Sequence, residues 1–427
     1  MTQTDPPPST DRPAAGAATA PQAATTAQAA TASGAVDGCP AFPFHWEGVE
    51  PAAEYARLRA ERPVLQVRLP SGRRAWLVTR HADARRVFSD PRLSRAAACA
   101  EKDDFAGVNP PAGSLFALDP PEHTAMRALV NKAFTARRVE NLKPWIADRA
   151  ERLVARLVRQ GPPADLVTGF ARPMSIGTLC RLLGVPDSDH ARFAQWSHAL
   201  LSTAGDGAEI EETRRRLGGY VARLIEARRA VPADDLVSAL VEAVDREDAA
   251  PRQAIALVMA ILVAGHDAMA NELAGTAYLL MTRPGMAERL RAEPDLLPSA
   301  VEEVLRYISQ IAVGGFPRVA LEDVRIGGVL IRAGDTVIAA IDSANRDAEV
   351  FPDPDELRVD RWPRGHLAFG HGIHRCLGAQ LARAQLAAAM SALLTGLPGL
   401  RLAVPHGDLE WDRDSFGRGL LSLPATW

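Results

Sequence analysis

Cysteines and aromatic residues are scarce in this chain of 427 residues, which holds four Cys and only 5% Phe, Trp and Tyr. The cysteines, at positions 39, 99, 180 and 376, are too few and too irregular for a disulfide-stapled secreted scaffold, which predicts a reducing, cytoplasmic location. A large excess of charge of one sign is also missing, since the formal net charge is −3. We therefore expect no nucleic-acid partner.

Long hydrophobic runs are absent as well. The longest apolar stretch, residues 255–265, is well short of the roughly 20 residues that a membrane helix needs. The first ten residues contain no Lys or Arg, and no apolar segment follows them, so no secretory signal is visible. We expect no membrane association.

The N-terminal segment lacks the residues that build a core. Residues 1–36 hold 12 Ala, 7 Thr and 5 Pro but no Leu, Ile, Phe, Tyr or Trp. Such a segment cannot offset the entropy lost on ordering, so we predict a disordered tail over residues 1–38, either a passive leader or a flexible interaction arm. Residues 39–427 have globular composition throughout and are predicted to form one large domain.

The pattern of that domain is mainly helical, with a smaller β-rich region. Strands are predicted at 75–78, 324–330 and 336–341, next to glycine-containing turns. Helices are predicted at 144–159, where Pro144 suits a first turn, and at 211–229, 254–281, 298–307 and 378–394. The stretch 254–281 is apolar nearly all round, which predicts a helix running through the core.

One cysteine has a distinctive setting. Cys376 follows a loop with Gly370 and Gly372, and Gly378 opens an Ala- and Leu-rich helix. The N–H groups and positive dipole end of a helix N-terminus stabilise a thiolate, and glycines let the backbone approach a bulky flat group. A thiolate in such a loop is suited to holding haem iron.

Other interpretations of this loop remain open. His366, His371, His374 and Cys376 are four possible zinc ligands within eleven residues, although no second Cys pair accompanies them. A buried, inert cysteine is the commonest fate of a free Cys. As a dinucleotide-binding loop the segment is a weak match, because the third glycine is missing.

The loop from Phe369 to Gly378 resembles the Phe-Gly-x-Gly-x-His-x-Cys-x-Gly signature of the cytochrome P450 haem-thiolate enzymes. The resemblance extends from about residue 40 to the C-terminus and implies the fold of that family, with haem b between a long central helix and the cysteine loop. It implies Cys376 as the axial iron ligand, Phe369 beside the sulfur, and Gly370, Gly372 and Gly378 as cofactor-binding positions.

Further motifs fit the same family. Glu303 and Arg306 resemble the Glu-x-x-Arg motif of a helix in this family, and Arg361 resembles the third partner of that motif. A carboxylate shared by two guanidiniums would anchor the cysteine loop. Alone, these residues would be surface ion pairs. By the same resemblance, His123, Arg127, Arg318 and His374 are expected to reach the haem propionates.

The segment 264–271 resembles the oxygen-binding part of the central helix, with Gly265, Asp267, Ala268 and Asn271 as predicted catalytic positions. A glycine inside a helix suggests room for haem and oxygen, and Asp267 suits a proton-carrying role unless it pairs with a distant Arg. Ala268 departs from the family, which has Thr here, so the hydroxyl that organises proton delivery is missing. A polar group of the substrate, an ordered water or Asn271 must replace it.

Short stretches near residues 74–78, 315–318, 402–411 and 423–427 look like members of the family that oxidise cyclodipeptides. We therefore expect oxidative carbon–carbon coupling or hydroxylation of a tryptophan-containing cyclodipeptide. The alternatives are a hydroxylase of a polyketide or other natural product, and a non-catalytic haem-binding protein.

The same resemblance gives six residues expected to contact the small-molecule substrate: Phe105, Val108, Asn109, Phe116, Trp196 and Phe316. A core or solvated position is the ordinary interpretation of each. No segment could hold a flavin or an iron–sulfur cluster, so electrons are expected from a ferredoxin and its NAD(P)H-dependent reductase. Four cations are candidates for a docking face for the ferredoxin: Lys132, Arg137, Arg138 and Arg375.

Overall fold

The computed structural model describes residues 1–2, 39–100, 114–201, 207–247, 250–308, 310, 316–413 and 417–427. Most of the predicted tail therefore lies outside the described residues, as do Phe105, Val108 and Asn109. The chain divides into a unit Met1–Cys39 and a unit Pro40–Trp427, and the second unit contains all the elements below.

The helices are α1 (Glu54–Glu61), α2 (His81–Ser89), α3 (Arg95–Ala100), α4 (Glu122–Ala133), α5 (Ala136–Gln160), α6 (Arg172–Leu183), α7 (His190–Leu201), α8 (Gly207–Ala230), α9 (Leu236–Arg246), α10 (Pro251–Thr282), α11 (Met286–Ala292), α12 (Leu297–Tyr307), α13 (Ile341–Ala344) and α14 (Ala379–Gly396). The strands are β1 (Val64–Arg68), β2 (Arg74–Val78), β3 (Leu93–Ser94), β4 (Ala164–Asp165), β5 (Arg318–Ala320), β6 (Val324–Ile326), β7 (Val329–Ile331), β8 (Thr336–Ala339), β9 (Arg401–Leu402), β10 (Trp411–Asp412), β11 (Gly419–Leu420) and β12 (Pro424–Thr426).

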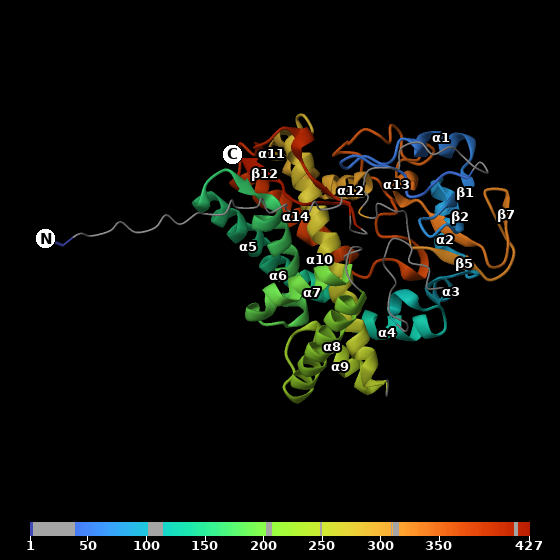
Figure 1. Ribbon diagram of the computed structural model, residues 1–427, viewed down its shortest axis with the longest axis horizontal. Coiled ribbons are helices and arrows are strands. Elements are labelled where there is room, and N and C mark those ends of the chain that lie inside the picture. Colours follow the sequence, from blue (N-terminus) through green and yellow to red (C-terminus); the bar gives the residue numbers. More distant parts are fainter. Residues whose placement is uncertain are drawn as a thin grey trace. The chain divides into compact units, whose positions relative to one another are not determined.

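Helix α10 is the centre of the helical part, as its composition predicts (Figure 1). It packs against α6, α7, α8, α9 and α14. By length and composition alone this helix could cross a membrane. Its neighbours on several sides instead make it the core helix of the fold, and the prediction of a mainly α protein with a smaller β-rich region is confirmed.

The largest sheet has the strand order β1-β2-β8-β5-β3 and lies away from α5–α9 (Figure 1). Only β2 and β8 pair in parallel; the other neighbours are antiparallel. The predicted strand 324–330 is instead the hairpin β6–β7, because Gly327 and Gly328 take φ angles of 55° and 82° and turn the chain. The predicted strand 336–341 ends at Ala339, and α13 begins at Ile341.

Helix α5 corrects one prediction, because Pro144 lies inside it rather than in its first turn. The helix begins one residue after Thr135, whose hydroxyl accepts a hydrogen bond from the Arg138 N–H. An interior proline removes one helical hydrogen bond, at a cost of about 3 kcal/mol. The apolar face of α5, which packs against α14 with Val154 close to Gly396, offsets that cost.

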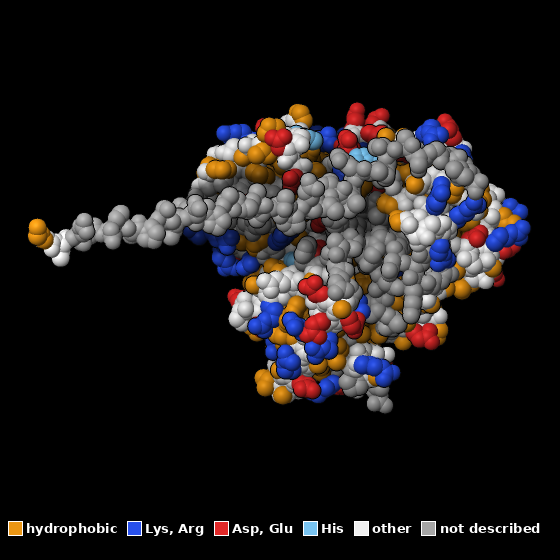
Figure 2. All heavy atoms as spheres, viewed as in Figure 1, with side chains coloured by type: hydrophobic (Ala, Val, Ile, Leu, Met, Phe, Trp, Pro, Cys, Tyr) orange, Lys and Arg blue, Asp and Glu red, His pale blue; other side chains and the backbone are white. Residues whose placement is uncertain are grey.

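Charged side chains of both signs are interspersed over the exposed surface of α8 and α9 (Figure 2). Ion pairs one turn apart connect them, such as Arg215 with Glu212 and Arg246 with Glu242, each at 2.5 Å. This surface is mixed in sign, in keeping with the small net charge of the chain.

Candidate active site

The loop before α14 holds Cys376 in an accessible position. The Cys376 N–H donates to the Phe369 carbonyl at 2.9 Å, which closes the loop. Gly370 and Gly372 have φ angles of 66° and 72°, and a side chain on Gly372 would collide with the carbonyl oxygen of Phe88 at the end of α2. The glycines therefore let the loop turn and lie directly on α2.

Cys376 has accessible surface although it lies well inside the protein, and its thiol is surrounded by donors and cations. Burial raises the pKa of the Cys376 thiol, while the Gly378 N–H and the guanidiniums of Arg127, Arg375 and Arg383 act to lower it. Because a metal binds the thiolate, these groups favour the form of Cys376 that serves as a ligand.

A buried carboxylate network supports this loop from α12. Glu303 accepts two hydrogen bonds from Arg306, both at 2.8 Å, and one from Arg361 Nε at 3.0 Å. The side chains of Glu303 and Arg306 are fully buried. Arg306 also donates to the carbonyls of Asn345 and Pro354, at 3.0 and 2.7 Å, so the network joins α12 to the segment that precedes the cysteine loop.

A second carboxylate network was not predicted from the sequence. Glu302 accepts from Arg383 Nε at 2.5 Å and Arg383 Nη2 at 2.9 Å, and lies 3.1 Å from His366 Nε2. The Arg383 guanidinium lies 4.7 Å from the centre of the Phe369 ring. The Ala368 N–H donates to His366 Nδ1, so Nε2 carries the proton and donates to Glu302. Glu302 on α12 thereby binds two side chains, His366 and Arg383, that both contact the Phe369 ring.

The predicted propionate residues form a cluster of donors without carboxylate partners. The His123 and His374 rings have centres 4.2 Å apart, and Nε2 of each is buried without a hydrogen-bond partner in the described parts of the chain. Burial, assisted by His123 and Arg318, lowers the pKa of His374 to about 3. Burial, with Arg95 nearby, lowers the pKa of Arg318 to about 9.

Arg127 lies at the edge of this cluster and donates to the Arg375 carbonyl at 2.7 Å. Arg95, which the sequence analysis missed, is buried and has an unpartnered Nη2 among the described residues. Asp119 is the carboxylate nearby, but it accepts hydrogen bonds from Ser94 and the Arg95 N–H. An excess of buried donors of this kind fits a ligand that carries two carboxylates, such as haem.

The zinc interpretation of the loop fails. No three His, Cys, Asp or Glu side chains are grouped to hold a metal ion in the described ranges, which include all four proposed ligands. His366 donates to Glu302 and His374 packs on His123, so these two rings face different partners.

The middle of α10 shows where the predicted oxygen-activating residues lie. His266 Nδ1 is 3.0 Å from Asp267 Oδ1, without the alignment of a hydrogen bond. A side chain on Gly265 would press against Leu179 of α6, so the glycine allows close helix packing, and its role in making room for haem and oxygen stays a prediction. Ala268 is exposed, as is Ala264 one turn earlier, so α10 presents small side chains to an accessible space.

Asn271 faces a different neighbour. A side chain added to Gly419 of β11 would lie 2.5 Å from Asn271 Oδ1, so the Asn271 amide lies against the backbone of that strand. Its predicted role in proton delivery stays a prediction.

Among the predicted substrate contacts, Phe116 and Phe316 are brought together, with ring centres 6.3 Å apart. Arg95 lies over the Phe316 ring at 4.8 Å and donates to the Phe116 and Pro317 carbonyls, at 3.2 and 2.6 Å. Trp196 instead packs with Phe193 and Tyr220 where α7 meets α8, which is a core-type contact.

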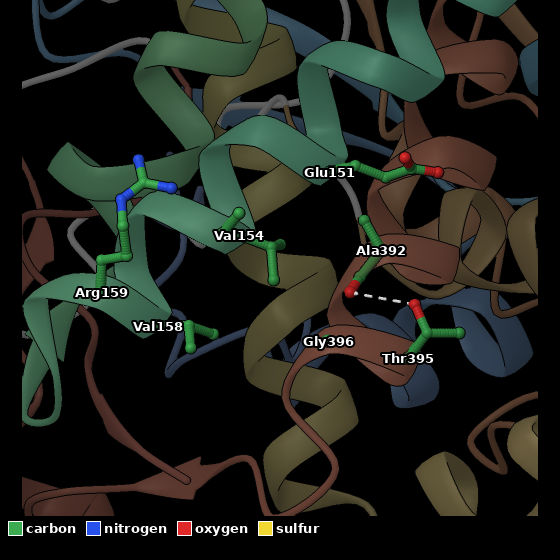
Figure 3. Close-up of a pocket in the computed structure, with 8 residues that line it drawn as sticks. Glu151, Val154, Val158, Arg159, Ala392, Thr395 and Gly396 are labelled. Atoms are coloured by element: carbon green, nitrogen blue, oxygen red, sulfur yellow. Dashed lines mark hydrogen bonds between the residues drawn. The ribbon is translucent and has the colours of Figure 1, made fainter.

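A shallow pocket of about 440 Å³ lies between α5 and α14 (Figure 3). Val154 and Val158 line it from α5, and Ala392 and Thr395 from α14. The Thr395 hydroxyl donates to the Ala392 carbonyl at 3.4 Å, within the helix. None of the candidate site residues that the structure describes lines this pocket.

Comparison with known proteins decides the family. The family model "Cytochrome P450" matches residues 205–424. The chain is 45% identical to mycinamicin IV hydroxylase/epoxidase of Micromonospora griseorubida over 91% of its own length and 98% of that protein. The chain belongs to the cytochrome P450 family. It is also 47% identical to nocardicin C N-oxygenase of Nocardia uniformis subsp. tsuyamanensis, over 87% of its length and 94% of that protein.

The fold agrees with this assignment. A solved structure of the mixed-function P450 MycG superposes with a TM-score of 0.85 at 45% identity, covering 91% of this chain and 100% of that one. The protein is thus a bacterial cytochrome P450 monooxygenase whose cofactor is haem b. When bound, haem supplies the oxygen-activating redox chemistry.

The residues of this P450 fit that cofactor. Cys376 offers an accessible sulfur as iron ligand, and His123, His374, Arg318 and Arg127 offer donors for the propionates. The two carboxylate networks hold the cysteine loop in place from α12.

Proposed function

We propose that this cytochrome P450 hydroxylates or epoxidises a polyketide of the macrolide type in bacterial secondary metabolism. The observation that carries the proposal is the 45% identity to mycinamicin IV hydroxylase/epoxidase, which extends over nearly the whole of both chains. The exposed small side chains of Ala264 and Ala268 on α10 are compatible with a bulky substrate.

Of the two substrate classes expected from the sequence, the polyketide is the better supported. None of the relatives reported above is named for a cyclodipeptide, whereas one is named for an oxidation of mycinamicin IV. The similarity therefore favours the polyketide alternative. N-Oxygenation is a second candidate, because the chain is 47% identical to nocardicin C N-oxygenase.

Electrons are proposed to come from a ferredoxin and its NAD(P)H-dependent reductase in the cytoplasm. Of the four cations proposed as a docking face, Lys132 is paired with Glu247, and Arg138 Nη1 lies 3.4 Å from Asp234. The exposed side chains of Arg137 and Arg375 are thus the better candidates for contact with an acidic carrier.

The substrate class is tested by spectral titration of the ferric protein with mycinamicin IV, nocardicin C and a tryptophan-containing cyclodipeptide. We expect the low-to-high-spin shift, and an oxygenated product in a surrogate ferredoxin system, with the macrolide. A shift and product with only the amine or only the cyclodipeptide would contradict the macrolide proposal. A shift with no product from any of them would also contradict the macrolide proposal.

A further inference from the structure

Glu272 is a buried carboxylic acid in the central helix to which neither the sequence motifs nor the comparisons assign a role. It lies on α10 one turn after Ala268, and only 4% of its surface is exposed. Its Oε1 has no hydrogen-bond partner among the residues that the structure describes. A buried carboxyl group without a cation is costly, so its presence in an otherwise apolar helix calls for a reason.

Among the residues that the structure describes, the neighbour of the Glu272 carboxyl group is neutral. The Gln310 side chain, in the segment after α12, acts on the pKa of Glu272, and within the described ranges no charged or titratable side chain contributes to it. The backbone of Gln310 is held by the Arg418 N–H, which donates to the backbone carbonyl of Gln310 at 2.7 Å. On α10, the Thr276 hydroxyl donates to the Glu272 carbonyl, which leaves the carboxyl group uninvolved.

Burial raises the pKa of Glu272 to about 8, against a smaller opposing effect of the Gln310 side chain. The carboxyl group is therefore mostly protonated at neutral pH. The Glu272 carboxyl group thus carries a proton on α10, one turn after Ala268, which replaces the hydroxyl residue of the family.

Helix geometry points this acid toward Ala268. Residues four apart lie on the same side of a helix, with Cβ atoms about 5–6 Å apart. Helical side chains generally lean toward the N-terminus, which is the direction from Glu272 to Ala268. Asn271, the other polar neighbour, is turned to Gly419 of β11.

We propose that Glu272 is a proton-relay residue, which supplies protons through water to the oxygen-activating face of α10 at Ala268. Monooxygenation consumes O2, two electrons and two protons, and places one oxygen atom in the product and the other in water. The ferredoxin-type partner supplies the electrons. For each of the two protons, the O–H bond of Glu272 breaks, the proton moves to a water molecule beside Ala268, and the carboxylate regains a proton from solvent. This inference rests on membership of the family and not on the macrolide proposal.

The first experiment needs no substrate. With NADPH, a surrogate ferredoxin and its reductase, O2 is reduced either by two electrons to H2O2 or by four electrons to water, and only the second route requires O–O cleavage. We expect Glu272→Gln to raise the H2O2 formed per NADPH several-fold while the CO spectrum of the reduced protein keeps its thiolate band. Glu272→Asp should fall between the two, and the double variant Glu272→Gln with Ala268→Thr should form less H2O2 than Glu272→Gln alone.

The control outcomes are distinct. An unchanged H2O2 share in Glu272→Gln overturns the proposal, and so does a raised share that Ala268→Thr does not lower. A purely structural role would instead reduce the thiolate band in Glu272→Gln without a change in the H2O2 share of the intact fraction, and that also overturns it.

The second experiment does not depend on turnover. The infrared spectrum of the wild-type holoenzyme should contain the C=O band of a protonated carboxyl group that shifts in D2O, disappears as the pH rises through about 8, and is missing in Glu272→Gln. Absence of this band at neutral pH would overturn the proposal even if the variant failed to fold.

Discussion

Removal of the charge on Glu303 should destabilise the folded protein far more than removal of the charge on an exposed carboxylate. Glu303 Oε1 accepts from Arg306 Nη2, Arg361 Nε and the Arg358 N–H, and Oε2 accepts from Arg306 Nε, all within 3.0 Å. In Glu303→Gln the amide oxygen can keep the three bonds of Oε1. The amide NH2 then faces Arg306 Nε, a second donor, and the buried Arg306 loses its counter-charge.

The cost follows from these contacts. Breaking a buried ion pair by neutralising one partner costs about 3–5 kcal/mol, which is a large share of the roughly 5–15 kcal/mol that stabilises a folded protein. Urea unfolding of the holoenzyme, followed by circular dichroism and by haem absorbance, measures the loss. Asp360→Asn is the matched control, because Asp360 pairs with Arg289 at 3.1 Å on the surface, where such pairs contribute little.

We expect a large decrease of the urea midpoint in Glu303→Gln and almost none in Asp360→Asn. Equal, small decreases in both variants would refute the view that the Glu303 network anchors the cysteine loop.

Two further predictions concern the same region. The pKa of Glu302 is lowered from 4.5 to about 2 by hydrogen bonds from Arg383 and His366, which outweigh the effect of burial. Because the folded-state pKa of Glu302 is depressed, the stabilisation by its charged form is present above about pH 4.5 and is lost as the pH falls toward 2. The free energy of unfolding, measured over this pH range, should therefore depend less on pH in Glu302→Gln than in the wild type. An equally steep pH dependence in the variant would contradict this. In the same urea assay, Gly372→Ala should destabilise the protein more than Gly370→Ala. Both positions have positive φ, but an added Cβ at position 372 would collide with the Phe88 backbone, whereas one at position 370 would meet no atom within 4 Å. Equal losses would show that the contact with α2 is unimportant.

The sequence predicts those parts of the site that are local along the chain. The loop from Phe369 to Cys376 and the Glu303–Arg306 pair depend on neighbours in sequence or on one helix face, so their resemblance to short motifs of the family identifies them. Glu302 was missed because successive helical residues point about 100° apart, so adjacent glutamates serve two separate networks. Its partners His366 and Arg383 lie 64 and 81 residues away, and no local pattern predicts such contacts.

Other differences have the same origin. Gly265 packs close to Leu179, and Asn271 lies against Gly419, and both neighbours come from distant segments. Glu272 could have been found, because it is a carboxylate in an apolar helix, the same feature that singles out Asp267. Arg95 offered no signal, since an arginine next to Ser94 is ordinary in a surface segment, and only the fold buries it.

The thiolate ligand is the central claim, and the absorption spectrum of the reduced, CO-treated protein tests it most directly. We predict the red-shifted band of a haem-thiolate protein in the wild type and its loss in Cys376→Ala. Absence of the band from well-folded, haem-loaded wild-type protein, or its survival in Cys376→Ala, would contradict the assignment of Cys376 as the iron ligand.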